Sequence, residues 1–154
     1  MAILDNAVWL TGAGGTAANG NTTITEGGNS TTVTATFSAN AWDASQNGYN
    51  VSDFGAFGVS SPITASYDFS TPVENLSFDI NHLNDDGAST YDDSWTIYAY
   101  DDNGDLIDAA TVIAGLGGLQ DETVITNADG SVTLEAAGTI SNDVTISLAG
   151  PVSQ

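Results

Sequence analysis

The sequence predicts an all-β protein, an antiparallel β-sandwich with a jelly-roll-like arrangement, and three observations carry this prediction. Apolar and polar residues alternate with a period of two in several segments, which places the apolar set on one face of a half-buried strand. Turn residues separate these segments about every eight to twelve residues, as in sandwiches. No segment shows apolar residues at helical spacing over three turns. We expect a single domain, residues 1–154, because this length fits one core of ordinary size.

The first half of the chain contains four candidate strands. Ala2–Leu10 is apolar enough for a first strand, and Thr22–Thr25 is a short second one. Thr31–Ala39 alternates most clearly, and Ile63–Phe69 alternates again. Between these two strands, Trp42–Asn50 has the polar, turn-prone composition of a structured loop.

The second half is organised around Leu76–Ile107, in which two alternating runs flank an acidic loop. The dipeptide Asn103-Gly104 after the second run is the strongest short signal for a hairpin turn. A second hairpin is predicted over Glu122–Ala136, with its turn at Asn127–Gly130. Asp143–Ala149 alternates as a last strand, with its valine, isoleucine and leucine inward, and Val112–Ala114 is expected to be extended.

The charge of the chain is entirely negative. It has 20 Asp and Glu residues, no Lys or Arg, and a formal net charge of −20. Compaction of like charges opposes folding, and no side-chain salt bridge to Lys or Arg is available to offset it. External cations are the remedy, and Ca²⁺ suits loops of Asp, Asn and backbone carbonyls because it takes six to eight oxygen ligands in flexible geometry. Halophilic adaptation is an alternative explanation for the acidity.

The same composition excludes several partners. Nucleic acids and anionic membranes are bound through Lys and Arg, so neither is expected. The apolar runs are too short for membrane insertion. Cysteine is absent, so no disulfide framework exists, and a bound metal is the expected stabiliser in its place.

The candidate calcium site lies at the end of the strand that begins at Leu76. Asp79 and Asn81 point the same way from that strand, and the following loop can fold its own oxygens back toward them. Asp101–Asp105 does not fit an EF-hand loop, because its Gly comes at the fourth position and no Glu follows at the twelfth. The candidate ligands are Asp79, Asn81, Asn84, Asp85, Asp86, Asp92, Asp93 and Asp101.

Aromatic residues outside the predicted core are candidate platforms for sugar rings. Tyr98 and Tyr100 share a strand face with Ser94 and Thr96, so they are predicted to point away from the core. The candidate ligand-binding residues are Trp42, Tyr49, Tyr91, Tyr98 and Tyr100. Ordinary packing at the rim of the core is the alternative role for most of them. A row of threonines at 32, 34 and 36 also admits an ice-binding face, although such rows are common on strands.

The central stretch resembles a known domain. PVENLSFDI, an acidic loop and DDSWTIYAYDDNGDLI are similar to a domain of large acidic bacterial surface proteins exported by type I secretion, which carry RTX calcium-binding repeats or Hint domains elsewhere. The matching positions are Phe78, Ile80, Asp93, Tyr100, Asp101 and Gly104. The resemblance covers about half the chain, and it implies a calcium-stabilised, extracellular, non-enzymatic sandwich within a larger parent protein.

These observations favour a non-catalytic, calcium-binding module at the cell surface or outside the cell, for adhesion or carbohydrate recognition. Its expected partners are a glycan or copies of itself, and its expected cofactor is Ca²⁺. A structural subunit that assembles by strand addition into a filament or surface layer is the alternative, with the apolar start of the chain as the donated strand. A glycoside hydrolase is a weaker alternative, because abundant acids form pairs by chance and no Lys or Arg stabilises a developing anion.

Overall fold

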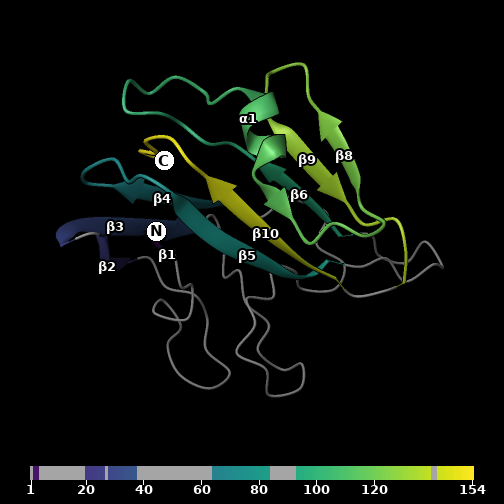
Figure 1. The fold of residues 1–154 in the computed structure, drawn as a ribbon, viewed down its shortest axis with the longest axis horizontal. Coiled ribbons are helices and arrows are strands. Elements are labelled where there is room, and N and C mark those ends of the chain that lie inside the picture. The colour runs from purple at the N-terminus through teal and green to yellow at the C-terminus, as the bar shows by residue number, and fades with distance from the viewer. Residues whose placement is uncertain (1, 4–19, 27, 38–63, 84–92, 140–141) are drawn as a thin grey trace.

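The computed structural model describes residues 2–3, 20–26, 28–37, 64–83, 93–139 and 142–154. Within these ranges the fold is all-β, as predicted, with one short helix (Figure 1). The elements are β1 (Ala2–Ile3), β2 (Gly20–Glu26), β3 (Asn29–Phe37), β4 (Ala65–Phe69), β5 (Leu76–Leu83), β6 (Ser94–Ile97), α1 (Ala109–Ala114), β7 (Leu116–Gly117), β8 (Thr123–Thr126), β9 (Val132–Glu135) and β10 (Asn142–Leu148). The jelly-roll order of a sandwich stays a prediction.

The strands form three sheets, with the orders β1-β5-β10-β7, β2-β3-β4 and β6-β9-β8. All pairs are antiparallel except β1 with β5, which is parallel. β1 is the described part of the predicted first strand, and it pairs with β5 of the same chain. Figure 1 shows β5 and β10 side by side across the middle of the molecule.

In the sheet β2-β3-β4, buried and exposed side chains alternate as the sequence pattern predicts. Val33 and Ala35 on β3 are fully buried, whereas the threonines at 32, 34 and 36 are exposed on the other face. Across the register, Thr34 lies opposite Asn21 of β2 and Asp68 of β4, so the exposed face is polar on all three strands. The predicted threonine row is therefore confirmed, in the arrangement that is common on strand surfaces.

The hydrophobic core draws residues from all three sheets and from α1. In β10, Val144, Ile146 and Leu148 are buried, as the alternation predicted. They lie in one cluster with Leu134 of β9 and Val112 of α1. Burial of each such side chain contributes about 1.5–3 kcal/mol, so this shared cluster is the main force that joins the sheets.

Both predicted turns are present, the first closed by an isolated bridge and the second between two paired strands. Tyr100 pairs with Leu106 around the Asn103-Gly104 turn, in which Gly104 has a φ of 81°. β8 pairs with β9 around the Asn127–Gly130 turn, where Gly130 has a φ of 90°. Positive φ is unfavourable for residues with a side chain, which explains why glycine occupies both turns.

The expectation that Val112–Ala114 is extended is wrong, because these residues belong to α1. The Asp108 side chain caps this helix by accepting a hydrogen bond from the Ala110 backbone nitrogen at 3.4 Å. Ala109 and Val112, three residues apart, bury one face. A helix of six residues is too short for a periodic sequence pattern, and its β-branched residues have the composition of a strand.

After β10, the segment Val152–Gln154 joins two distant parts of the fold, and we call it the clasp segment. Val152 forms a bridge with Val73, in the corner between β4 and β5. The Ser153 backbone nitrogen donates to the Tyr100 carbonyl oxygen at 2.8 Å. The clasp segment therefore connects the β4–β5 corner to the hairpin that contains Tyr100.

Candidate functional site

The best-defined site is a patch on the sheet β6-β9-β8, at the end of β6. Tyr98 follows β6 and is 50% exposed, as the alternation predicted. Its hydroxyl donates to Oδ2 of Asp129 at 3.3 Å. Asp129 lies in the turn between β8 and β9, so the pairing of β6 with β9 brings the aromatic ring and the carboxylate together.

The Asp129 carboxylate is held in place by its own turn. The Ser131 hydroxyl donates to Oδ1 at 2.7 Å, and the Ser131 backbone nitrogen donates to the same oxygen at 3.0 Å. These hydrogen bonds, together with the bond from Tyr98, lower the pKa of Asp129. At neutral pH the patch therefore presents an ionised acceptor in a fixed position.

A row of polar groups continues from Asp129 across the sheet. The Asn127 amide donates to the hydroxyl oxygens of Ser131 at 2.9 Å and Thr133 at 2.8 Å. The hydroxyl oxygens of Thr133 and Thr96 lie 2.9 Å apart in the next hydrogen bond. Tyr98, Asp129 and Thr96 are the exposed members of this row. The groups that this row exposes are therefore a flat ring, a carboxylate and one hydroxyl, each of which can contact a polyhydroxylated ligand.

Sequence reasoning found Tyr98 but missed Asp129 and the residues that hold it. The Asn-Ala-Asp-Gly-Ser stretch, by its composition, predicts only a hairpin turn. Its signal for a site is that an Asp precedes Gly and Ser in a turn, a pattern in which the side chain accepts hydrogen bonds from its own backbone. Which side chain lies above that turn depends on the β6–β9 register, which is a long-range property.

Tyr100 and Asp101, two other predicted site residues, have structural roles in the turn that follows β6. Tyr100 is half-buried, and its backbone pairs with Leu106 and with the clasp segment. Oδ1 of Asp101 accepts from the backbone nitrogens of Asp105 at 2.9 Å and Asn103 at 2.8 Å. These two hydrogen bonds lower the pKa of Asp101, and the bond from Asp105 has the largest effect. Its carboxylate thus stabilises the turn.

Two other predicted metal ligands, Asp79 and Asp93, lie among the described residues. Each contacts a different part of the fold. Oδ1 of Asp79 accepts from the Thr145 hydroxyl at 2.7 Å, across the register of β5 and β10. The Asp93 backbone oxygen accepts from the Ala136 nitrogen at 3.0 Å. Outside the described residues lie Asn84, Asp85, Asp86, Asp92, Trp42, Tyr49 and Tyr91, together with the Asn81 side chain.

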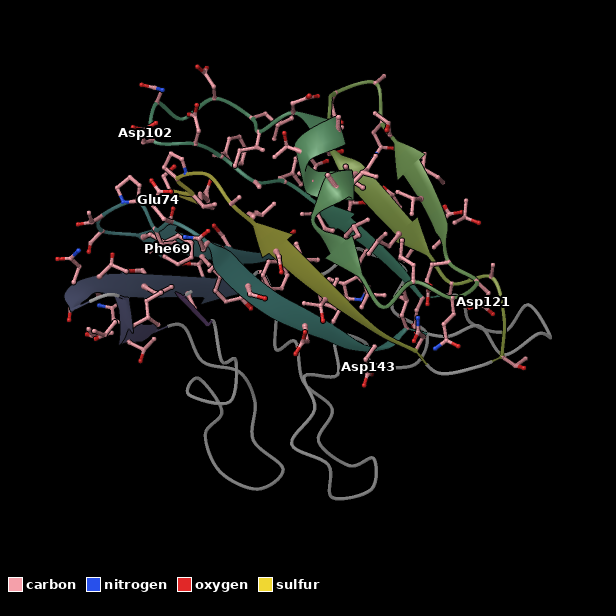
Figure 2. All side chains as sticks on the ribbon, in the orientation of Figure 1. Phe69, Glu74, Asp102, Asp121 and Asp143 are labelled. Carbon is pink, nitrogen blue, oxygen red and sulfur yellow. The ribbon has the colours of Figure 1, made fainter. Side chains whose placement is uncertain are left out.

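The described acids are spread over the molecule. Figure 2 shows Asp102, Asp121 and Asp143 at three separate parts of its rim. Within the part of the chain that the structure describes, no group of three or more His, Cys, Asp or Glu side chains is arranged to hold a metal ion. The predicted calcium site therefore stays a prediction that involves the acidic stretch at 84–92.

A second polar cluster that the sequence did not reveal joins β10 to the segment before β8. Asn142 is 5% exposed, and its amide nitrogen donates to Oε1 of Glu122 at 2.6 Å and to the Gly118 carbonyl at 2.8 Å. Its amide oxygen accepts from Gln120 Nε2 at 2.6 Å. Partial burial raises the pKa of Glu122, but the hydrogen bonds from the Gln120 backbone nitrogen and from Asn142 outweigh it, so the pKa is lowered. Every polar atom of the Asn142 side chain has a partner, which makes this cluster a structural tie.

Comparison of the chain with protein-family models, with curated proteins and with solved structures gave no match in any of the three. Among the described residues, no helix has the length and apolar character needed to cross a membrane.

Proposed function

We propose that this chain is a non-catalytic, extracellular module that binds carbohydrate at the patch formed by Tyr98 and Asp129. The observation that carries the proposal is the exposed tyrosine ring held beside an ionised carboxylate. Tyr98 is 50% exposed, which leaves part of its ring available for contact with a ligand. The exposed Thr96 hydroxyl, which is hydrogen-bonded to the buried Thr133 hydroxyl, extends the polar part of the same surface.

The chemistry of the patch favours a neutral or cation-bridged sugar. The Tyr98 ring offers a flat apolar face for a pyranose ring, and Asp129 accepts hydrogen bonds from sugar hydroxyls. With a net charge of −20, the chain repels anionic sugars unless a divalent cation bridges them. The ligand class on this proposal is therefore a neutral glycan, with acidic glycans bound only in the presence of calcium.

A glycan array probed with and without Ca²⁺ tests the proposal, followed by titration of the best ligand. Tyr98→Ala is expected to reduce affinity at least tenfold, because it removes the platform. Tyr98→Phe keeps the ring but removes the hydroxyl that donates to Asp129, and an intermediate loss is expected. Leu119→Ala is the matched control, since Leu119 is an exposed apolar residue at 40% exposure outside the patch. Equal affinities of the Tyr98→Ala and Leu119→Ala variants would rule the patch out.

Calcium enters the proposal as a stabiliser of the module. The support is the net charge of −20 without any Lys or Arg. Asp101 and Asp129 use their carboxylates for local hydrogen bonds. We propose as its ligands Asp79 on β5, whose Oδ1 also accepts from the Thr145 hydroxyl, and the oxygen-bearing residues that follow in the sequence, Asn81, Asn84, Asp85, Asp86, Asp92 and Asp93.

A further inference from the structure

The clasp segment, Val152–Gln154, fills a slot between two backbones. On one side, Val152 and Val73 exchange two hydrogen bonds of 2.9 Å, and the Phe69 nitrogen donates to the Ser153 oxygen at 2.9 Å. On the other side, the Ser153 nitrogen donates to the Tyr100 oxygen at 2.8 Å, and the Tyr100 nitrogen donates to the Gln154 oxygen at 2.9 Å. Both edges of this short strand are therefore satisfied by the slot, as in the middle of a sheet.

The side chains of the clasp segment fit the same slot. Val152 is 1% exposed and belongs to the hydrophobic cluster together with Val73. The Gln154 amide donates to Oγ of Ser66 at 3.0 Å and to Oδ1 of Asp68 at 2.8 Å. None of the three clasp residues carries a charged side chain, so the segment brings no side-chain carboxylate next to Asp68 or Asp101.

The link between β10 and the clasp segment has the properties of a hinge. Ala149–Pro151 makes no backbone hydrogen bond to another described residue. Ala149 is exposed, and the space around Gly150 is open. The clasp segment can therefore leave the slot by rotation within these three residues, without disturbance of β10.

We propose that this slot is a strand-acceptor site for a second copy of the same chain, and that two copies exchange their clasp segments. The slot recognises backbone groups and one buried valine, and a second copy presents the same groups. Because the exchanged contacts equal the intrachain ones, protein concentration and the repulsion between two chains of charge −20 decide the balance. Exchange therefore increases with concentration and with salt, which screens that repulsion. This proposal is independent of glycan binding at Tyr98 and Asp129.

The absence of cysteine allows a direct test with full-length chains. Val73→Cys and Val152→Cys are made in separate chains, which are mixed at high concentration and oxidised. Partners that exchange two hydrogen bonds in an antiparallel pair have Cα atoms about 5.5 Å apart, within the range of a disulfide. Both positions are buried, so the two thiols meet only when one chain's clasp segment enters the other's slot. We expect a disulfide-linked heterodimer whose yield increases several-fold with salt.

Two controls make the result decisive. Both substitutions in one chain are expected to close an intrachain disulfide and to abolish cross-linking, since the clasp is then locked. Ile113→Cys, on the exposed side of α1, mixed with Val73→Cys gives the yield from random collisions. Closure of the intrachain disulfide in the double variant shows that the two positions can be linked. If the heterodimer yield then stays at the level of random collisions at every protein and salt concentration, the proposal is overturned.

A second measurement requires no thiol. In the full-length Val152→Asp variant a carboxylate replaces the buried valine, which expels the clasp segment and leaves the slot open. A labelled peptide with the sequence of residues 149–154 is expected to bind this variant saturably, and to bind the unsubstituted chain at least tenfold more weakly. Equal binding, or none, by a folded Val152→Asp variant contradicts the proposal.

Discussion

The Asn142 amide nitrogen lies 2.6 Å from Oε1 of Glu122, which ties the start of β10 to the residue that precedes β8. The Gln120 backbone nitrogen donates to the other carboxylate oxygen at 2.8 Å. Glu122 therefore accepts hydrogen bonds at both of its oxygens while it is half-buried. The free energy of unfolding should therefore depend on the protonation of Glu122 and on the Asn142 amide.

Stability is expected to decrease at acidic pH partly through Glu122. Its folded pKa lies below the ordinary value of 4.5, so the unfolded chain binds its proton first as the pH falls. The stabilisation is fully present above that ordinary value and is lost as the pH falls through the folded pKa. Chemical denaturation at several pH values should give a shallower acid slope for Glu122→Gln than for the unsubstituted chain.

The control for this experiment is Asp121→Asn, which removes the same unit of charge from the neighbouring exposed residue. If both variants changed the acid slope equally, the effect would come from net charge and the hydrogen-bonded tie would not be its cause. Asp101 and Asp129 also have lowered pKa values, so the remaining slope in either variant has the same sign.

Asn142→Ala is expected to lower the free energy of unfolding by about 1–3 kcal/mol, because buried partners lose their hydrogen bonds. The atoms affected are the Gly118 carbonyl oxygen, Glu122 Oε1 and Gln120 Nε2. Asn103→Ala, in the exposed turn, is the comparison and should change stability by no more than about 0.5 kcal/mol. Urea denaturation measures both, and equal losses would mean that the Asn142 cluster contributes nothing specific.

Gly115→Ala is expected to destabilise the chain strongly. A Cβ at this position would overlap the Ser147 carbonyl oxygen of β10, and the Ser147 nitrogen already donates to the Gly115 oxygen at 2.9 Å. The end of α1 would have to move away from the sheet, at a cost of about 1–3 kcal/mol. Gly150→Ala enters open space and should keep the melting temperature within about a degree or two of the original. Similar melting temperatures for the two variants would contradict the close contact.

Calcium is expected to raise the melting temperature, because a ligand that binds only the native state stabilises it by mass action. Magnesium should raise it less, since it demands octahedral geometry and releases water reluctantly. Joint substitution of Asp79 and Asp93 by Asn should remove most of the calcium effect. Thermal melts in calcium, magnesium and excess chelator provide the measurement, and identical curves in all three would refute the calcium proposal.

The fold class and most strands were predictable because they follow from local patterns. The alternation at Val33 and Ala35 and at Val144, Ile146 and Leu148 corresponds directly to burial. The two turns were predictable because only glycine adopts their positive φ readily. α1 was not predictable, because a helix of six residues is too short for its apolar residues to show the helical period.

The candidate site was predictable only in part, because it depends on register. The outward orientation of Tyr98 follows from alternation, but its contact with Asp129, 31 residues later in the sequence, requires β6 and β9 to pair. The Asn142–Glu122 tie likewise joins residues 20 positions apart through the packing of two sheets, those that contain β10 and β8. The slot of the clasp segment depends on contacts over more than 50 residues, which no local pattern encodes.

The position of β5 has a consequence for synthesis of the chain on the ribosome. β5 lies between β1 and β10, and Ser77 is hydrogen-bonded to Ser147, 70 residues later in the sequence. At an elongation rate of about 5–20 residues per second, β10 is synthesised several seconds after β5. Until β10 emerges, the edge of β5 has only water as its partner on that side, and the core cannot close. Folding of this sheet is therefore completed only after translation has passed β10, so the nascent chain carries an unpaired strand edge until then.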